Sequence, residues 1–256
     1  MRTPQEQERG LVAILDALGA STYTDTEISR FLKSRELVLQ LLNEKAEEIL
    51  GDVKADMVST FTFNDTIVIV LKLNRAPNLR DVRAFFTLLR KFVVDSLVNK
   101  ILFRGAISIG TFIANEGTNT VMGQAVTDAA AWYDRADWFG IHATPRATIL
   151  IDQLIEPKGD EDKAAHVVVG YAVPMKDGSS PTLKAVNWPK AFFVSNLTPC
   201  APGEPPRAKL LSLLGLHQIP IGVETKFFNS IAFFDSIVES PAVRKLLVKH
   251  STGRAR

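Results

Sequence analysis

The sequence predicts an α+β fold: a ferredoxin-like split unit of order βαββαβ, with extra strands and helices toward the C-terminus. Two observations predict it. Short runs of Val, Ile, Phe and Thr favour a pleated, half-buried surface. They alternate with longer segments in which apolar residues recur every three or four positions, as on one face of a helix. The resulting order is strand, helix, strand, strand, helix, strand, then one more helix and strand. This order is typical of an antiparallel sheet with helices on one face.

Each expected element rests on a local pattern. Asn64-Asp65 has turn character between two β-branched runs, which predicts a tight hairpin. Gly51 follows a long helical pattern and is a plausible stop for it. The expected strands are Leu11–Asp16, 57–63, 66–73, Ile101–Asn115 and Arg146–Asp152. The expected helices are Asp25–Leu50, Leu79–Asn99 and Gly123–Gly140.

Beyond Asp152 the pattern loosens, and these residues are expected to decorate the same domain. We therefore predict a single domain over 1–256, with a core of about 10–152 and decorations over about 153–256. The decorations are expected to comprise a hairpin (166–175 and 182–188), helices (Ala208–Gly215 and Glu224–Lys249) and two loops (158–165 and 199–206).

Composition excludes several classes of function. The chain has 30 basic and 28 acidic side chains and a formal charge of +2, a balance that does not favour nucleic-acid binding. Its one cysteine, Cys200, cannot form a disulfide within the chain. No run approaches the roughly 18 apolar residues of a membrane span. The N-terminus lacks the apolar core of a secretion signal, so a soluble, cytoplasmic protein with no membrane partner is expected.

Two acids stand in matching contexts. Asp16 ends the first strand and Asp65 lies in the hairpin that leads into the third strand, which is the neighbour of the first in a split unit. Asp65 as an ordinary turn residue is the alternative. Two half-buried carboxylates close together repel each other, and each resists ionisation unless a cation is shared. A pair of Mg²⁺ or Mn²⁺ ions resolves this, because hard cations prefer carboxylate oxygen and suit phosphoryl chemistry.

The turn after Asp16, ALGAS, has small residues whose backbone N–H groups can approach an anion. Two metal carboxylates beside such a turn imply a nucleoside triphosphate.

These residues resemble the class III nucleotide cyclases. LVAILDALGAS is similar to the strand and turn of that family, and FTFNDTIVIV to its second metal-aspartate hairpin. FRGAISIG is similar to its Arg-containing strand, and MGQAVTDAAAWYDRA to the dimer helix that follows. With VPMK and VNW downstream, the closest resemblance is to the pyrimidine nucleotide cyclases of bacterial antiphage systems (Pycsar).

The resemblance implies a nucleotide cyclase fold and a lyase that converts UTP or CTP to the 3′,5′-cyclic monophosphate and pyrophosphate with two divalent ions. It implies a homodimer and a downstream effector activated by the cyclic nucleotide. The implied catalytic residues are Asp16, Asp65 and Arg104, and the implied metal ligands are Asp16, Ala17 and Asp65. The implied substrate-binding residues are Gly19, Ala20, Ser21, Met57, Phe61, Thr120, Thr127 and Lys176. Core packing is the alternative for Met57 and Phe61, and pairing with a surface acid is the alternative for Arg104.

The departures from the family concern the dimer helix and base reading. The family's helix Asn and Arg correspond to Thr127 and Ala131, which cannot do the same job, and Arg135 is the candidate substitute. The adenine-reading Lys and Asp of adenylate cyclases correspond to Phe61 and Thr120, so a purine-specific pair is missing. This favours a pyrimidine. A purine cyclase and a catalytically inactive nucleotide-binding or dimerisation domain are the alternatives.

Overall fold

The computed structural model describes residues 7–50, 57–73, 75–155, 167–194, 205–217 and 223–239. The strands form one sheet of order β2-β3-β1-β4-β6-β8-β7, with β5 paired to β4 beside this path. The strands are β1 (Glu8–Ala17), β2 (Val58–Phe63), β3 (Thr66–Leu73), β4 (Phe103–Asn115), β5 (Thr120–Met122), β6 (Gly140–Ala143), β7 (Val168–Ala172) and β8 (Thr182–Val186). The α-helices are α1 (Asp25–Leu50), α2 (Leu79–Val98), α3 (Gln124–Ala130), α4 (Pro145–Leu154), α6 (Trp188–Val194), α7 (Pro206–Leu214) and α8 (Glu224–Val238).

The first four strands have the arrangement of a ferredoxin-like unit. Strand β1 lies at its centre, antiparallel to β3 on one side and to β4 on the other, and β2 pairs with β3. The predicted α+β class, the βαββαβ order and the extra C-terminal strands and helices are therefore confirmed. The short strand β6 extends the sheet parallel to β4, and the β7–β8 hairpin completes it.

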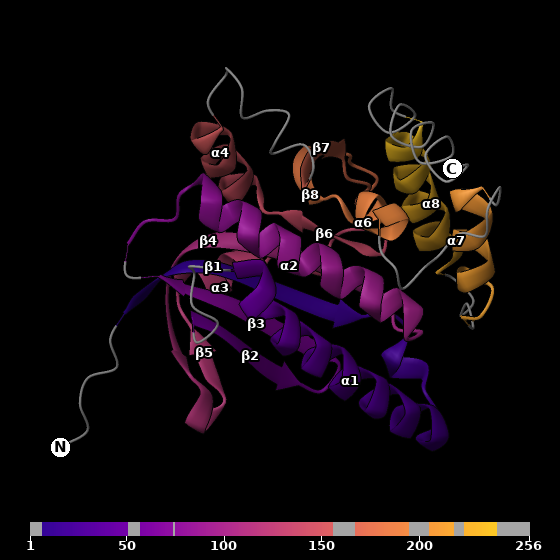
Figure 1. Ribbon diagram of the computed structural model, residues 1–256, viewed down its shortest axis with the longest axis horizontal. Coiled ribbons are helices and arrows are strands. Elements are labelled where there is room, and N and C mark those ends of the chain that lie inside the picture. Colours follow the sequence, from indigo (N-terminus) through magenta and orange to yellow (C-terminus); the bar gives the residue numbers. More distant parts are fainter. Residues whose placement is uncertain are drawn as a thin grey trace, which may run out of the picture.

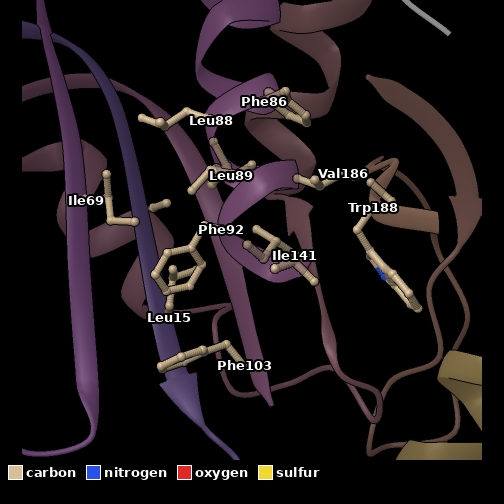
Figure 2. Packing of buried hydrophobic residues seen from close by; sticks show 14 of the residues in the cluster. Leu15, Ile69, Phe86, Leu88, Leu89, Phe92, Phe103, Ile141, Val186 and Trp188 are labelled. Carbon is tan, nitrogen blue, oxygen red and sulfur yellow. The ribbon is translucent and has the colours of Figure 1, made fainter. Parts of the chain in front are cut away.

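The two faces of the sheet are covered differently. Because side chains alternate along a strand, Leu11, Ala13 and Leu15 of β1 point to a first core cluster, which includes residues of α1 and α2. Figure 1 shows these two long helices lying across one face of the sheet, and Figure 2 shows side chains of α2 meeting those of β1, β3 and β6. The opposite face carries a smaller second cluster that includes Val12 and Ile14 of β1 and residues of α3.

Several predicted elements are confirmed. Helix α1 has the expected bounds Asp25–Leu50, and α2 ends one residue before the expected Asn99. The hairpin around Asn64-Asp65 and the later β7–β8 hairpin also form. Each of these elements has a strong hydrophobic period of its own, which explains why local patterns sufficed.

The strand expected at Arg146–Asp152 was wrong, because these residues belong to helix α4. The preceding Thr144 caps the helix: its Oγ1 accepts a hydrogen bond from the Ala147 amide at 3.2 Å. Pro145 occupies the first turn, where its missing N–H costs nothing. Ala147 and Ile151 are buried four residues apart, as on a helix face. The parallel strand of this unit is instead β6, at Gly140–Ala143.

The helix expected over Gly123–Gly140 was too long, because α3 ends at Ala130. The residues that follow bond to a distant segment instead of continuing the helix. The Asp137 amide donates to Pro174 O at 2.8 Å, and the Lys176 amide donates to Arg135 O at 2.9 Å. A helix cannot use these groups in both ways, and this tertiary pairing prevails.

Some expectations lie outside the described residues. They include the loop 158–165, most of the loop 199–206, Cys200, and the part of the last predicted helix beyond Glu239. Among the described residues, no helix is long and apolar enough to cross a membrane.

Candidate active site

The sheet register brings Asp16, Asp65 and Arg104 together at one end of the central strands. This end of the sheet is called the acid edge below. Near the end of β1, Asp16 lies between Thr66 of β3 and Arg104 of β4 in the two antiparallel ladders. Asp65 directly precedes Thr66, and its carbonyl accepts a hydrogen bond from the Ala17 amide at 3.2 Å.

The turn that carries Asp65 is fixed on both sides. Asn64 has φ 54°, in the left-handed region that asparagine tolerates better than most residues. Its carbonyl accepts a hydrogen bond from Arg35 Nη1 of α1 at 2.5 Å. Backbone geometry and a long-range contact therefore both hold the predicted hairpin turn.

Asp16 and Arg104 form an ion pair at this edge. Arg104 Nε and Nη2 donate to Asp16 Oδ2 at 3.1 and 2.9 Å. The Arg104 and Asp16 side chains are 12% and 16% exposed, so water screens the pair only partly. Both hydrogen bonds reach Oδ2, and Oδ1 takes no part in them. The pair is thus more sheltered than the surface pairing that was the alternative for Arg104.

The electrostatic balance at Asp16 is unfavourable for its charge. Burial raises the pKa of the Asp16 carboxyl, Arg104 opposes this, and the charges of Asp65 and Asp134 raise the pKa further, so that it ends above its ordinary value. Arg104 therefore does not fully offset burial and the two neighbouring acids.

Asp134 is the acid that sequence reasoning missed. It follows α3 in a segment that was expected to be helical, and its carboxylate lies 3.5 Å from Lys176 Nζ. Its neighbour Tyr133 feels the same acids: burial raises the pKa of the Tyr133 hydroxyl, and the charges of Asp16 and Asp134 raise it further. Asp16, Asp65 and Asp134 together are called the acid cluster below. The structure thus brings Lys176 to this cluster through its ion pair with Asp134, a residue that no local pattern identified.

Arg135, the candidate substitute for the missing family Arg, is exposed. Its guanidinium lies 5.0 Å from the ring centroid of Trp132, a cation–π contact. Hydrogen bonds from Ser179 lower the pKa of Asp177, and the charge of Arg135 adds to this lowering. Arg135 therefore stands beside the acid cluster, held by other partners.

The turn after Asp16 leaves backbone donors open. Gly19 adopts φ 83° and begins the short 3₁₀ turn η1 (Ala20–Thr22). The Leu18 amide donates to Leu102 O and the Thr22 amide to Gly19 O. Within the described part of the chain, no hydrogen bond uses the amides of Gly19 and Ala20. These two belong to the three consecutive residues, 19–21, that were expected to hold phosphate.

A cavity of about 210 Å³ lies behind this turn, lined in part by Gly19, Tyr23 and Leu102. Two cations, Arg30 of α1 and Lys100 before β4, and one acid, Glu27, also line it. The lining of this cavity thus includes one more Lys or Arg side chain than acids.

The residues expected to read the base lie on both faces of the sheet. Phe61 is fully buried in the second core cluster, as its core-packing alternative stated. Met57 packs against the first cluster, on the other face of the sheet. Thr120 Oγ1 donates to Thr118 O at 3.1 Å, and Thr127 is exposed on α3. Base recognition by these residues stays a prediction.

The donor set at the acid edge suits a hard divalent cation. The described residues contain no group of three or more His, Cys, Asp or Glu side chains able to hold a metal ion. Asp65 is nevertheless close enough for its charge to raise the pKa of Asp16, after burial as the main cause, and Asp16 keeps Oδ1 outside its ion pair. Mg²⁺ is usually held by one or two carboxylates, with waters and substrate phosphates completing its octahedron. The two acids therefore fit an ion that arrives with a triphosphate.

Comparison with known proteins finds similar solved structures. No protein-family model and no curated protein matches the sequence. The chain is similar to the adenylyl cyclase CyaB from P. aeruginosa at 13% identity and TM-score 0.44, over 71% of this chain and 94% of that one.

Two further neighbours are also cyclases. The catalytic core of a rhodopsin-guanylyl cyclase with converted specificity, in complex with ATPαS, is 14% identical with TM-score 0.42, over 72% of this chain and 98% of that one. The adenylate/guanylate cyclase/hydrolase from Silicibacter pomeroyi is 16% identical with TM-score 0.41, over 70% and 97%. At these identities the likeness concerns the fold alone.

Proposed function

We propose that this chain is a nucleotide cyclase that converts UTP or CTP to the 3′,5′-cyclic monophosphate and pyrophosphate. One observation carries the proposal. Two carboxylates, Asp16 and Asp65, lie at neighbouring strand ends, and Asp16 directly precedes a turn whose Gly19 and Ala20 amides are open among the described residues. Paired acids beside anion-binding amides suit a metal-bound triphosphate.

Asp16 and Asp65 would hold two Mg²⁺ or Mn²⁺ ions, with the Ala17 carbonyl as a third protein ligand. When bound, such ions neutralise phosphate charge and lower the pKa of a coordinated hydroxyl.

The residues of the chain would bind and orient the substrate. The amides of Gly19, Ala20 and Ser21 would hold the triphosphate, and Arg104 and Lys176 would contact phosphate oxygens. In the reaction, the ribose 3′-oxygen forms a bond to the α-phosphorus and loses its proton to solvent. The bond from the α-phosphorus to the bridging oxygen breaks, and pyrophosphate leaves with that electron pair. In-line geometry is what the acid edge and the turn would enforce together.

We further propose that the active form is a cytoplasmic homodimer, with the site shared between subunits. Thr127 and Ala131 are exposed on and after α3, where a partner subunit would approach. Met57, Phe61 and Thr120 would read a pyrimidine, and Phe61 would have to leave its buried packing to do so. The cyclic product would activate an effector in antiphage defence.

A second candidate is an inactive nucleotide-binding or dimerisation domain. It is favoured by one observation: the exposed positions on and after α3 carry Thr127 and Ala131, which cannot stabilise a transition state as Asn and Arg do.

Incubation of the purified protein with each of the four ribonucleoside triphosphates and Mn²⁺, followed by mass analysis, tests the proposal. A 3′,5′-cyclic pyrimidine monophosphate is the expected product. A cyclic purine would overturn the base assignment and leave the metal mechanism standing. No product from any triphosphate, together with measurable nucleotide binding, would favour the inactive domain.

A further inference from the structure

Helix α8, near the end of the described chain, is fastened to the segment that follows α3. Three of its side chains reach Asp137. Lys226 Nζ lies 3.0 Å from the Asp137 carboxylate, Asn229 Nδ2 donates to Asp137 O at 2.7 Å, and the Thr225 hydroxyl bonds to the same carboxylate. One turn of the helix thus converges on a single residue.

The next residues of α8 continue this contact. Ser230 is fully buried, and its Oγ accepts a hydrogen bond from the Phe139 amide at 2.7 Å. Phe227 packs edge-on against Phe139 with ring centroids 6.1 Å apart, and Phe233 packs edge-on against Trp138 at 5.0 Å. The interface is therefore a closed part of the core.

The contacts at this interface stabilise the charged form of Asp137. Burial by itself raises the pKa of the carboxyl, but the hydrogen bonds from Lys226 and Thr225 and the charge of Lys226 outweigh burial and lower the pKa. Lys226 and Asp137 are only 12% and 18% exposed, so their attraction is stronger than that of a surface pair.

The segment held by α8, residues 131–139, is called the clamped segment below. It is also joined to the turn that carries Lys176. The Asp137 amide donates to Pro174 O, the Lys176 amide donates to Arg135 O, and Ala136 forms a β-bridge with Met175. These two short segments are thus joined, so the contacts that hold Asp137 help to place Lys176, together with the bonds of Met175 to Ser179 and Gly178 within its own turn.

The two joined segments place the charged residues Asp134 and Lys176 near the acid edge. Asp134, three residues before Asp137, is close enough to Asp16 to raise the pKa of its carboxyl, and Lys176 lies 3.5 Å from Asp134. Both side chains are about half exposed, with only each other as an ion-pair partner among the described residues. Their own contacts are thus too weak to fix them.

We infer that α8 is a positioning element of the candidate active site. Lys226 and Asn229 act as positioning residues: they hold Asp137, and through it they place Lys176 and Asp134 against the triphosphate. This inference rests on the proposed function and deepens it, because it gives the C-terminal helices a role in substrate binding.

The test compares Lys226→Met and Asn229→Ala with a control on the same helix. Asp235→Asn removes the α8 pair with Arg207 of α7, at 3.0 Å, which does not involve the clamped segment. Lys226→Arg is the rescue variant, because it keeps the charge opposite Asp137. Two quantities are measured on full-length protein: amide hydrogen exchange of residues 131–139 and 173–178, and the KM for the triphosphate that the wild type cyclises.

We expect Lys226→Met and Asn229→Ala to speed exchange in both segments, with α1 and α2 unchanged. We expect the KM to rise about tenfold, whereas mere loss of folded protein lowers the maximal rate and leaves KM alone. Lys226→Arg restores both quantities, and Asp235→Asn changes neither by more than about twofold. In a Lys176→Ala background, Lys226→Met adds little to KM, because both changes act through the same side chain.

Unchanged exchange in residues 173–178 would overturn the inference, whatever the activity. Faster exchange with an unchanged KM would overturn it as well, and so would an equal effect from Asp235→Asn. If the wild type turns over no triphosphate, the proposed function fails, and the exchange data still decide whether α8 places the Lys176 turn.

Discussion

The candidate site has a strand half and a loop half, and the two are held in different ways. In the strand half, Asp16 and Arg104 are neighbours in the β1–β4 ladder, 2.9 Å apart and largely sheltered. In the loop half, Asp134 and Lys176 are 3.5 Å apart, with side chains 49% and 44% exposed. The first pair is fixed by the sheet that also forms the core. The second depends on a distant helix.

The difference teaches where a binding site can be adjusted. A change in the Asp16–Arg104 pair disturbs a buried charge and the packing below it, so its effects on activity and on stability are coupled. Asp65 is partly exposed in its turn, so it lacks this coupling. A change in the loop half alters an exposed pair, so it affects binding with little effect on folding. The variants below test this separation, from the largest expected effect to the smallest.

Asp65→Asn is expected to have the largest effect. The amide keeps the size of the side chain but loses the charge that would hold a cation, so turnover is expected to fall by roughly three orders of magnitude. The midpoint of thermal unfolding should stay within about 2 °C of the wild type, because Asp65 is partly exposed in a turn. Cyclase assays and thermal unfolding measure the two effects. Substantial residual turnover would refute the metal role.

Arg104→Met tests whether changes to the Asp16–Arg104 pair affect stability. It leaves Asp16 without its cation beside Asp65 and Asp134, and we expect the free energy of unfolding to fall by about 3 kcal/mol. Urea unfolding at pH 7 measures this. Arg207→Met is the matched control, because that pair is more exposed, and it should cost about 0.5 kcal/mol or less. Equal costs for the two variants would mean that the strand pair is not sheltered.

His142 should make the sheet beside the strand half sensitive to acid. It is fully buried on β6, and neither ring nitrogen has a hydrogen-bond partner among the described residues. Burial lowers its pKa from 6.5 to about 4. The unfolded chain therefore takes up a proton as pH falls below 6.5, while the folded chain does not until about pH 4, so stability is lost across this range.

The expected loss from His142 is about 2 kcal/mol in the free energy of unfolding between pH 7.5 and pH 5. His142→Leu should remove that part of the pH dependence, as measured by urea unfolding at both pH values. His217, whose pKa burial also lowers to about 4, contributes with the same sign and remains in the variant. An unchanged difference between the two pH values would contradict the assignment to His142.

Lys176→Ala should have the smallest effect and should fall on binding alone. Removing an exposed cation is expected to raise the KM for the triphosphate about tenfold, with a change in unfolding free energy of about 0.5 kcal/mol or less. Steady-state kinetics and urea unfolding measure the two quantities. A large loss of stability would show that the loop half is not separable from the fold.

The sequence predicted the strand half and only part of the loop half, for a physical reason. Asp16 and Asp65 follow from elements with strong periods of their own, and the pairing of β1 with β3 follows from the order of those elements. Asp134 was not predicted as a site residue, because the alanine-rich run after Gly123 has high helix propensity. The hydrogen bonds that replace a helix here are made with Pro174 and Lys176, which lie far away in the sequence.

The strand misassigned at Arg146–Asp152 has a similar cause. Its Thr, Ile and Leu residues favour a strand locally, whereas the Thr144 cap and Pro145 start a helix. Helix α8 was expected as an element, but its contacts with Asp137 and Phe139 span about ninety residues of sequence. No local pattern reports contacts of that range.

The register that sets Asp16 opposite Arg104 also bears on how this chain can change in evolution. Side chains alternate along β1, so inserting or deleting one residue there would turn Asp16 away from Arg104 and send Val12 and Ile14 to the opposite core. Length changes in β1 should therefore be purged, while substitutions around Lys176 accumulate freely. Lineages of this fold are expected to diversify in substrate through the loop half and to keep the spacing of β1 unaltered.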